Sequence, residues 1–241
     1  MSLLQTTFKS GWITDLVLPP VPEGKTPSDV LYTGYRIALE MCSDANLMAR
    51  LNPLVQSVNT IGPSHAKAVD YQSLAADFGV DLSAQYATGR FTQYEIMDKL
   101  PLLFGYSTEL RYYSAIRPTK DGMEALTNPG SGVTIYGRFT VQIAQATGPE
   151  GGAGMGGSYA TNITGAEGSG ANVDVENNIG GATGTERGVG VIHFLETNEL
   201  KCNVFLSWYI KASTDKSHRT AHANFKERWI ARMKELGYPP A

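Results

Sequence analysis

The sequence predicts an α+β protein in which an antiparallel sheet closes on one long C-terminal helix. Segments 3–18, 90–143 and 189–201 are rich in β-branched and aromatic residues, as is typical of strands. Residues 203–236 instead carry the period of an amphipathic helix, with one stripe roughly 100° wide. The stripe is apolar at both ends and polar in the middle: Val204, Trp208, Asp215, His218, His222, Phe225, Trp229, Met233 and Leu236.

The closing helix has start and stop signals. Asn203 is the expected N-cap, and Gly237, followed by two prolines, is the expected end. An unbroken helix over this stretch would be about 50 Å long at 1.5 Å per residue. Because Ser213, Thr214 and Asp215 are weak helix formers, a break at this point is possible.

The N-terminal part of the chain predicts a strand followed by two short helices. Residues 3–18 form the strand and end at a pair of prolines. Thr26, with Pro27 behind it, starts the first helix, and Ser43 is the expected cap of a second helix over 44–51. A strand over 54–61 and a short helix over 71–78 follow.

From residue 90 onward the pattern is that of an antiparallel meander. Asp121-Gly122 and Asn128-Pro129-Gly130 are turn signals between the β-rich runs. In the run 133–143 the apolar residues share one parity and the polar residues the other, so one face of that strand is apolar.

A glycine-rich insertion separates this meander from the last strand. Between Gly148 and Gly190 lie 14 of the 26 glycines, with few large apolar residues, and we expect 148–188 to be a long excursion within one domain that spans 1–241. Residues 152–157 fit G-x-G-x-x-G, but no strand-turn-helix setting surrounds them, so we predict no nucleotide site there.

Composition excludes several classes of protein. A net charge of -3 and the absence of a basic stripe argue against a nucleic-acid binder. No run reaches the 18 apolar residues that a membrane span needs, and the N-terminus lacks a signal peptide, so we expect a cytoplasmic protein without an integral membrane segment. Cys42 and Cys202 have no metal-ligand spacing and are expected to be small buried residues.

The order of these elements, together with several short motifs, resembles a fungal START-like family of unassigned function. The motifs are Leu51-Asn52-Pro53-Leu54-Val55, Tyr94-Glu95-Ile96 with Asp98 and Pro101, Asp121-Gly122, Gly132-Val133-Thr134-Ile135 and Ser217-His218. The resemblance covers roughly 26–145 and 189–236. It implies the helix-grip fold of polyketide cyclases and lipid-binding START proteins, in which a curved antiparallel sheet wraps the last helix around a cavity. It supplies no catalytic residues.

Three polar residues on the closing helix are candidates for catalysis. Asp215, His218 and His222 stand three and four apart, so their side chains can meet, and a carboxylate could orient one imidazole while the other moves a proton. The alternative is a pair of structural histidines or an exposed polar patch. A zinc site is not expected, because Arg219 occupies the place of the glutamate in H-E-x-x-H.

Polar and aromatic residues on the predicted strands complete the candidate site. Inward-facing members would give an apolar cavity a few polar anchors, as in small-molecule sites. Tyr94 is a fourth catalytic candidate, and the candidates for substrate binding are Tyr112, Tyr136, Arg138, His193 and Trp208. The alternative is that the aromatics fill the sheet and Arg138 is solvated.

These observations lead to a cofactor-independent enzyme as the first hypothesis, because the sequence contains no nucleophile elbow, phosphate loop or cofactor motif. Its substrate would be a mostly apolar metabolite, polyketide- or terpenoid-derived, that it cyclises, isomerises or dehydrates in a pathway of secondary metabolism. The alternative is a non-catalytic lipid or sterol carrier with the same cavity. A third hypothesis is a protein-interaction module that docks through the glycine-rich segment.

Overall fold

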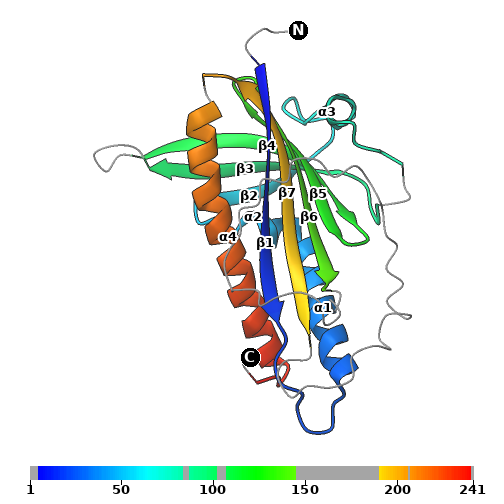
Figure 1. Ribbon diagram of the computed structural model, residues 1–241. Coiled ribbons are helices and arrows are strands. Elements are labelled where there is room, and N and C mark those ends of the chain that lie inside the picture. The colour runs from blue at the N-terminus through cyan, green and yellow to red at the C-terminus, as the bar shows by residue number, and fades with distance from the viewer. Residues whose placement is uncertain (1–4, 84–86, 102–106, 145–189, 206, 240–241) are drawn as a thin grey trace, which may run out of the picture.

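The chain forms one curved, open, seven-stranded antiparallel sheet with a long helix lying along its concave side (Figure 1). The computed structural model describes residues 5–83, 87–101, 107–144, 190–205 and 207–239. The predicted α+β class is therefore confirmed, and the arrangement is compatible with a helix-grip fold. The predicted insertion at 148–188 lies outside the described residues.

The elements follow the predicted order. They are β1 (Gln5–Val17), α1 (Pro27–Ser43), α2 (Ala45–Ala49), β2 (Val55–Ile61), α3 (Tyr71–Phe78), β3 (Thr92–Pro101), β4 (Ser107–Thr119), β5 (Gly122–Gly130), β6 (Val133–Ile143), β7 (Val191–Asn203) and α4 (Ser207–Glu235). The order of strands in the sheet is β1-β7-β6-β5-β4-β3-β2. The first strand of the chain thus pairs with the last, and β2 forms the opposite edge.

The short helices begin where local capping chemistry allows. Thr26 caps α1 in a reciprocal capping box with Asp29, as the sequence predicts. The prediction of Ser43 as the cap of α2 is wrong. Asp44 takes this role, and its carboxylate accepts hydrogen bonds from two backbone amides of the first turn.

The closing helix starts later than predicted and is not broken. Asn203 is the last residue of β7 and its side chain accepts a hydrogen bond from the Phe205 amide, so it shapes the turn before α4 instead of capping the helix. The helix runs through the weak helix formers at 213–215 without interruption. It ends as predicted, with the Tyr238 amide bonded to the Met233 carbonyl.

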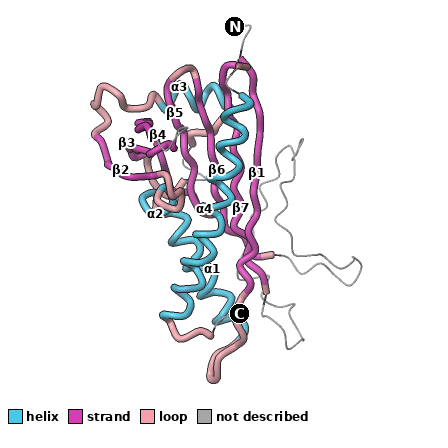
Figure 2. The backbone as a smooth tube through the Cα atoms, turned by 90° about the vertical axis from the view of Figure 1, so that its left-hand side faces the viewer, coloured by secondary structure: helices cyan, strands magenta, loops and turns pink. Residues whose placement is uncertain are grey.

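Helices cover the two faces of the sheet unequally. On the concave face, α1 and α4 pack against each other and against the sheet, as Figures 1 and 2 show. Phe194 of β7 stacks on Phe225 of α4 with ring centroids 4.0 Å apart, and the indole of Trp229 donates a hydrogen bond to the carbonyl of Gly34 in α1. The convex face carries α3, whose Leu74 packs against a smaller cluster on β4 and β5.

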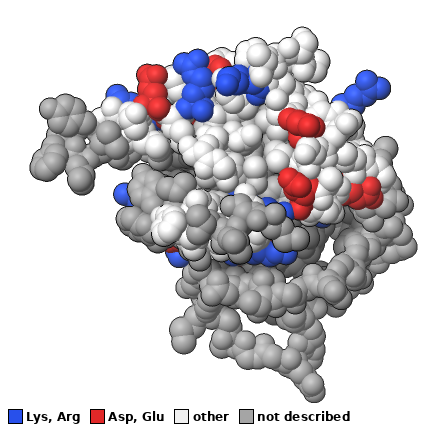
Figure 3. Space-filling model, turned by 90° about the horizontal axis from the view of Figure 1, so that it is seen from above, with Lys and Arg blue, Asp and Glu red and all other residues white. Residues whose placement is uncertain are grey.

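Charge is distributed without a continuous basic stripe on the face seen in Figure 3, where basic and acidic side chains surround an uncharged area. Among the described residues, no helix is long and apolar enough to cross a membrane. Cys42 and Cys202 are both buried, as predicted.

Candidate functional site

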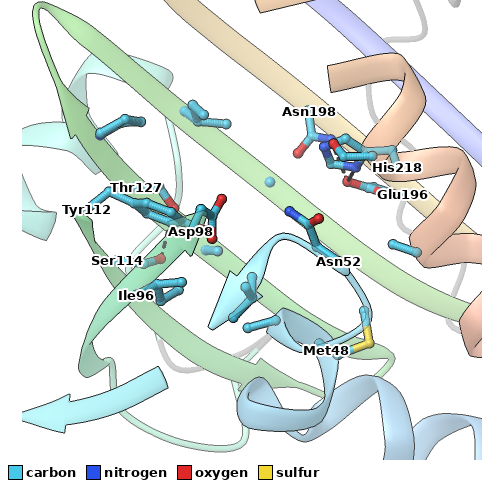
Figure 4. A pocket seen from close by; sticks show the side chains of 18 of the residues that line it. Met48, Asn52, Ile96, Asp98, Tyr112, Ser114, Thr127, Glu196, Asn198 and His218 are labelled. Atoms are coloured by element: carbon cyan, nitrogen blue, oxygen red, sulfur yellow. Dashed lines mark hydrogen bonds and ion pairs between the residues drawn. The ribbon is translucent and has the colours of Figure 1, made fainter. Parts of the chain in front are cut away.

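A cavity of about 460 Å³ lies between the concave face of the sheet and the helices α2 and α4. This volume is within the range of small-molecule sites. Its walls are largely apolar, with Met48, Leu51, Ile96, Leu110, Ile116, Met123, Ile135, Phe139, Phe194, Leu200 and Ile210 among the lining residues. Polar side chains form two groups in this wall, one on β7 and α4 and the other on β3, β4 and β5, and Asn52, from the turn between α2 and β2, stands apart from both (Figure 4).

The first polar group is built around Glu196, whose side chain is almost completely buried, at 1% exposed. Its Oε1 lies 2.5 Å from Nδ1 of His218 and accepts a hydrogen bond from Nδ2 of Asn198 at 2.6 Å. Its Oε2 lies 3.1 Å from Nε2 of His222. Each carboxylate oxygen therefore has at least one hydrogen-bond partner, as a buried charge requires.

The backbone places these groups by strand parity and helix spacing. Glu196 and Asn198 are two apart on β7 and so point to the same face, while His218 and His222 are four apart on α4. Gly137, which pairs with Asn198 in the sheet, leaves room for the amide, since a Cβ at this position would lie 2.7 Å from Asn198 Oδ1.

The ionic state of Glu196 follows from its neighbours. Burial by itself would raise the pKa of the carboxyl, but His218 and His222 outweigh burial and hold its pKa at about 2. Because an ionised carboxylate only accepts hydrogen bonds, both imidazole nitrogens that face it carry protons. The other nitrogen of His222, Nδ1, is 2.7 Å from Oγ1 of Thr14, so both nitrogens of this ring are engaged.

His218 differs from His222 because one of its ring nitrogens stays available. Its Nδ1 is bound to Glu196, and no described residue is hydrogen-bonded to its Nε2. The ring lines the cavity, its side chain is 26% exposed, and the indole of Trp12 stacks on it at 4.5 Å between centroids. Burial lowers the pKa of His218, but the Glu196 carboxylate outweighs this effect, and the pKa lies above its ordinary value.

The second polar group surrounds Asp98 of β3. The hydroxyl of Tyr112 donates a hydrogen bond to Asp98 Oδ1 at 3.3 Å. The Ser114 and Thr127 hydroxyls, on neighbouring strands, lie 2.8 Å apart. Burial in this apolar wall raises the pKa of Asp98 to about 6. Asp98 on β3 and His218 on α4, which both line the cavity, thus have pKa values above their ordinary values.

The structure brings two of the predicted catalytic residues together and separates the other two from the cavity. His218 and His222 share Glu196. Asp215 instead pairs with Arg219 at 2.9 Å and does not line the cavity, although its charge helps to raise the pKa of His218. Tyr94 packs at the edge of the main core, on the concave side but outside the cavity wall.

Among the predicted substrate-binding residues, Tyr112 lines the cavity and three others do not. Tyr136 donates to Glu124, Arg138 pairs with Asp121, and His193 pairs with Asp15. All three belong to the convex face, because their parity is opposite to that of the cavity-lining residues of β6 and β7. The prediction that they line the cavity is therefore wrong. The side chain of Trp208 lies outside the described part of the structure.

Sequence reasoning missed the two carboxylates that organise the cavity. On β7 the residues of one parity are Ile192, Phe194, Glu196, Asn198, Leu200 and Cys202, so Glu196 and Asn198 interrupt an otherwise apolar face. Asp98 likewise shares the parity of Ile96 and Leu100. A charged residue among strand positions that are otherwise apolar could have pointed to both carboxylates, since such a residue is buried only where it has partners or a function.

Within the described ranges, no group of three or more His, Cys, Asp or Glu side chains has metal-binding geometry. No curated protein matches the chain. Residues 33–230, more than half of the chain, match a family described as a domain of unknown function, DUF7053. This segment includes Asp98, Glu196, His218 and His222, whereas β1, with Trp12 and Thr14, precedes it. The chain therefore belongs to the DUF7053 family.

Proposed function

We propose that this protein is a cofactor-independent enzyme that binds a mostly apolar small metabolite in the cavity and transfers a proton to or from it. The observation that carries the proposal is the Glu196–His218 pair in the wall of an apolar cavity, where no described residue is hydrogen-bonded to the second imidazole nitrogen of His218. Cyclisation, isomerisation and dehydration are the reactions that such a site supports without a cofactor, and polyketide- or terpenoid-derived compounds have the required apolar character.

His218 is the proposed proton donor. With Nδ1 held by Glu196, the protonated ring presents Nε2–H to a ligand, where it stabilises charge that develops on a carbonyl oxygen and can transfer its proton. The raised pKa keeps this form populated near neutral pH. After transfer, Nε2 is a base that can recover a proton from another position of the same ligand.

The neighbours of His218 act as positioning groups. Glu196 fixes the tautomer and the ring orientation, and it is held in turn by Asn198 and by the Thr14–His222 pair. Trp12, which is the sheet partner of Glu196, covers one face of the imidazole. A ring that is held on two sides loses little conformational freedom when it reacts, and this preorganisation supports a catalytic role.

The sheet order and the position of α4 also support the START-like, helix-grip assignment that the sequence resemblance implies. Because that scaffold hosts binders and enzymes alike, the fold does not choose between the two functions. The enzyme is favoured by the polar group around Glu196, since a carrier of apolar molecules has no need for a titratable donor in its cavity wall.

The test uses an extract of apolar metabolites from the source cells, incubated with the wild-type protein and analysed by liquid chromatography and mass spectrometry. We expect a compound to be converted to a product of equal mass, or of that mass less water. His218→Gln should slow the conversion by roughly 10²- to 10⁴-fold, the usual contribution of a general acid. His193→Gln is the matched control, because His193 lies on the convex face.

Conversion at an unchanged rate in His218→Gln would remove the residue from the mechanism.

The second candidate function, a lipid or sterol carrier, is favoured by the apolar lining of the cavity. It predicts a different result: a ligand is retained by the wild-type protein in native mass spectrometry and is released chemically unchanged.

A further inference from the structure

The polar group around Asp98 lies at the other end of the cavity from His218 and has no part in the proton transfer described above. Asp98 comes from β3 and Tyr112 and Ser114 from β4, whereas Glu196 comes from β7 (Figure 4). Four strand spacings separate β3 from β7 in the sheet order, which corresponds to about 19 Å along the arc of the sheet; the gap across the cavity is shorter than this, because the side chains of both groups point to the concave side. Only an elongated ligand can reach both ends.

Asp98 has acceptor capacity that the described side chains do not use. The residue is 7% exposed, and Tyr112 is its one side-chain hydrogen-bond donor among the described residues. No Lys, Arg or His in the described ranges forms an ion pair with it. A carboxylate offers about four acceptor positions, so several of them remain for a ligand.

The neighbouring hydroxyls add to this capacity. Ser114 and Thr127 share one hydrogen bond, so within the described residues one of the two hydroxyl protons and several lone pairs remain unused. Both residues line the cavity together with Asp98 and Tyr112. Between this group and His218 the wall is formed by apolar residues of β5 and β6, such as Ala125, Ile135 and Phe139.

We infer that Asp98 and Tyr112, with Ser114 and Thr127, form a second subsite that binds a hydroxyl group at the far end of an elongated ligand whose carbonyl group lies at His218. The position of the carbonyl rests on the proposed function; the position of the hydroxyl rests on the geometry of the subsite. The ligand class is therefore an apolar, aromatic or alicyclic, hydroxy ketone. The ligand hydroxyl donates a hydrogen bond to Asp98 and stays neutral.

The pKa of Asp98 agrees with this assignment. Since its value is about 6, the carboxyl is mostly ionised at pH 7.5 and accepts a hydrogen bond from a neutral hydroxyl. A hydrogen bond to a charged acceptor is stronger than one between neutral groups. Replacing the ligand's hydroxyl group by a group of similar shape that cannot donate a hydrogen bond should therefore weaken binding.

The experiment compares two matched pairs of rigid probes at pH 7.5 by isothermal titration calorimetry. The first pair is 4-acetyl-4′-hydroxybiphenyl and its methoxy analogue; the second, shorter pair is 2-acetyl-6-hydroxynaphthalene and its methoxy analogue. In the wild-type protein the hydroxy member of at least one pair should bind at least tenfold more tightly than the methoxy member. In Asp98→Leu this ratio should fall to about one.

Two further variants keep the result interpretable. Tyr112→Phe retains the shape of the wall and should reduce the ratio severalfold, even if Asp98→Leu does not fold. His218→Gln should weaken both members of a pair equally and leave their ratio unchanged. The inference is overturned if neither pair binds to the wild-type protein, if hydroxy and methoxy members bind equally well, or if the ratio survives in Asp98→Leu. Because this affinity ratio measures binding alone, it tests the subsite independently of whether the protein turns over a substrate.

Discussion

Replacing Asp98 by Asn is expected to stabilise the protein at neutral pH and to have little effect at pH 4. Burial raises the pKa of this carboxyl from 3.8 to about 6. The folded state therefore binds the proton more tightly than the unfolded state does. Well below pH 3.8 the carboxyl is protonated in both states, and its ionisation does not affect stability. As the pH rises from about 4 to 6 the unfolded state ionises first, so the free energy of unfolding decreases.

The size of this effect follows from the difference between the two pKa values. At about 1.4 kcal/mol per pKa unit, Asp98 costs the wild-type protein about 3 kcal/mol of stability as the pH rises from well below 3.8 to 7.5, and about 2 kcal/mol of this is lost between pH 4 and pH 6. Asn is neutral at both pH values and still offers an oxygen to the Tyr112 hydroxyl. The variant should thus be more stable than the wild type by up to about 3 kcal/mol at pH 7.5.

Urea unfolding of both proteins at pH 4 and pH 7.5 measures the effect, and comparison at each pH cancels the titration of all other groups. Asp77→Asn is the matched control, since it makes the same chemical change at an exposed residue of α3. A variant that is less stable than the wild type at pH 7.5, or whose advantage is equally large at pH 4, would refute the reasoning. A stability gain at neutral pH would also show that Asp98 is costly to the fold, which is common at functional sites.

Three further changes test other parts of the structure. In Glu196→Gln the free energy of unfolding should fall less steeply between about pH 4.5 and 2 than in the wild type. With its pKa of about 2, Glu196 contributes stability above pH 4.5 that is lost as the pH falls through 2. Urea unfolding at a series of pH values checks this, and the same pH dependence in both proteins would contradict it. Gly34→Ala should lower the free energy of unfolding by about 1–3 kcal/mol, measured with urea, since a Cβ at this position would lie 3.2 Å from Trp229 and even closer to Leu18. Unaltered stability would mean that α1 and α4 pack less closely. Arg117→Met should lower the free energy of unfolding by about 3–5 kcal/mol, because it leaves Glu124 buried on the convex face without its cation. Thermal unfolding should show this loss, while the affinity of the probes for the cavity stays within twofold of the wild type.

The site was predictable only in part. The spacing of His218 and His222 on one helix follows from their sequence separation, and the structure places both at the cavity side of α4. Their common partner Glu196 lies more than 20 residues away on β7, so no local pattern connects them. Tyr136 and Arg138, candidates for substrate binding only if they face inward, lie on the convex side, because the apolar parity of β6 faces the cavity.

By itself, the sequence determined the class of the fold and the order of its elements. These depend on short-range physics: the alternation of β4 to β7, the capping box at Thr26, and the stop after Glu235 are all encoded within a few residues of where they act. Only the tertiary structure decided which strands are neighbours, that β1 pairs with β7, and which face of the sheet encloses the cavity. The ionic states of Glu196, His218 and Asp98 belong to this second level as well, because burial and charge neighbours arise only when β3, β7 and α4 come together.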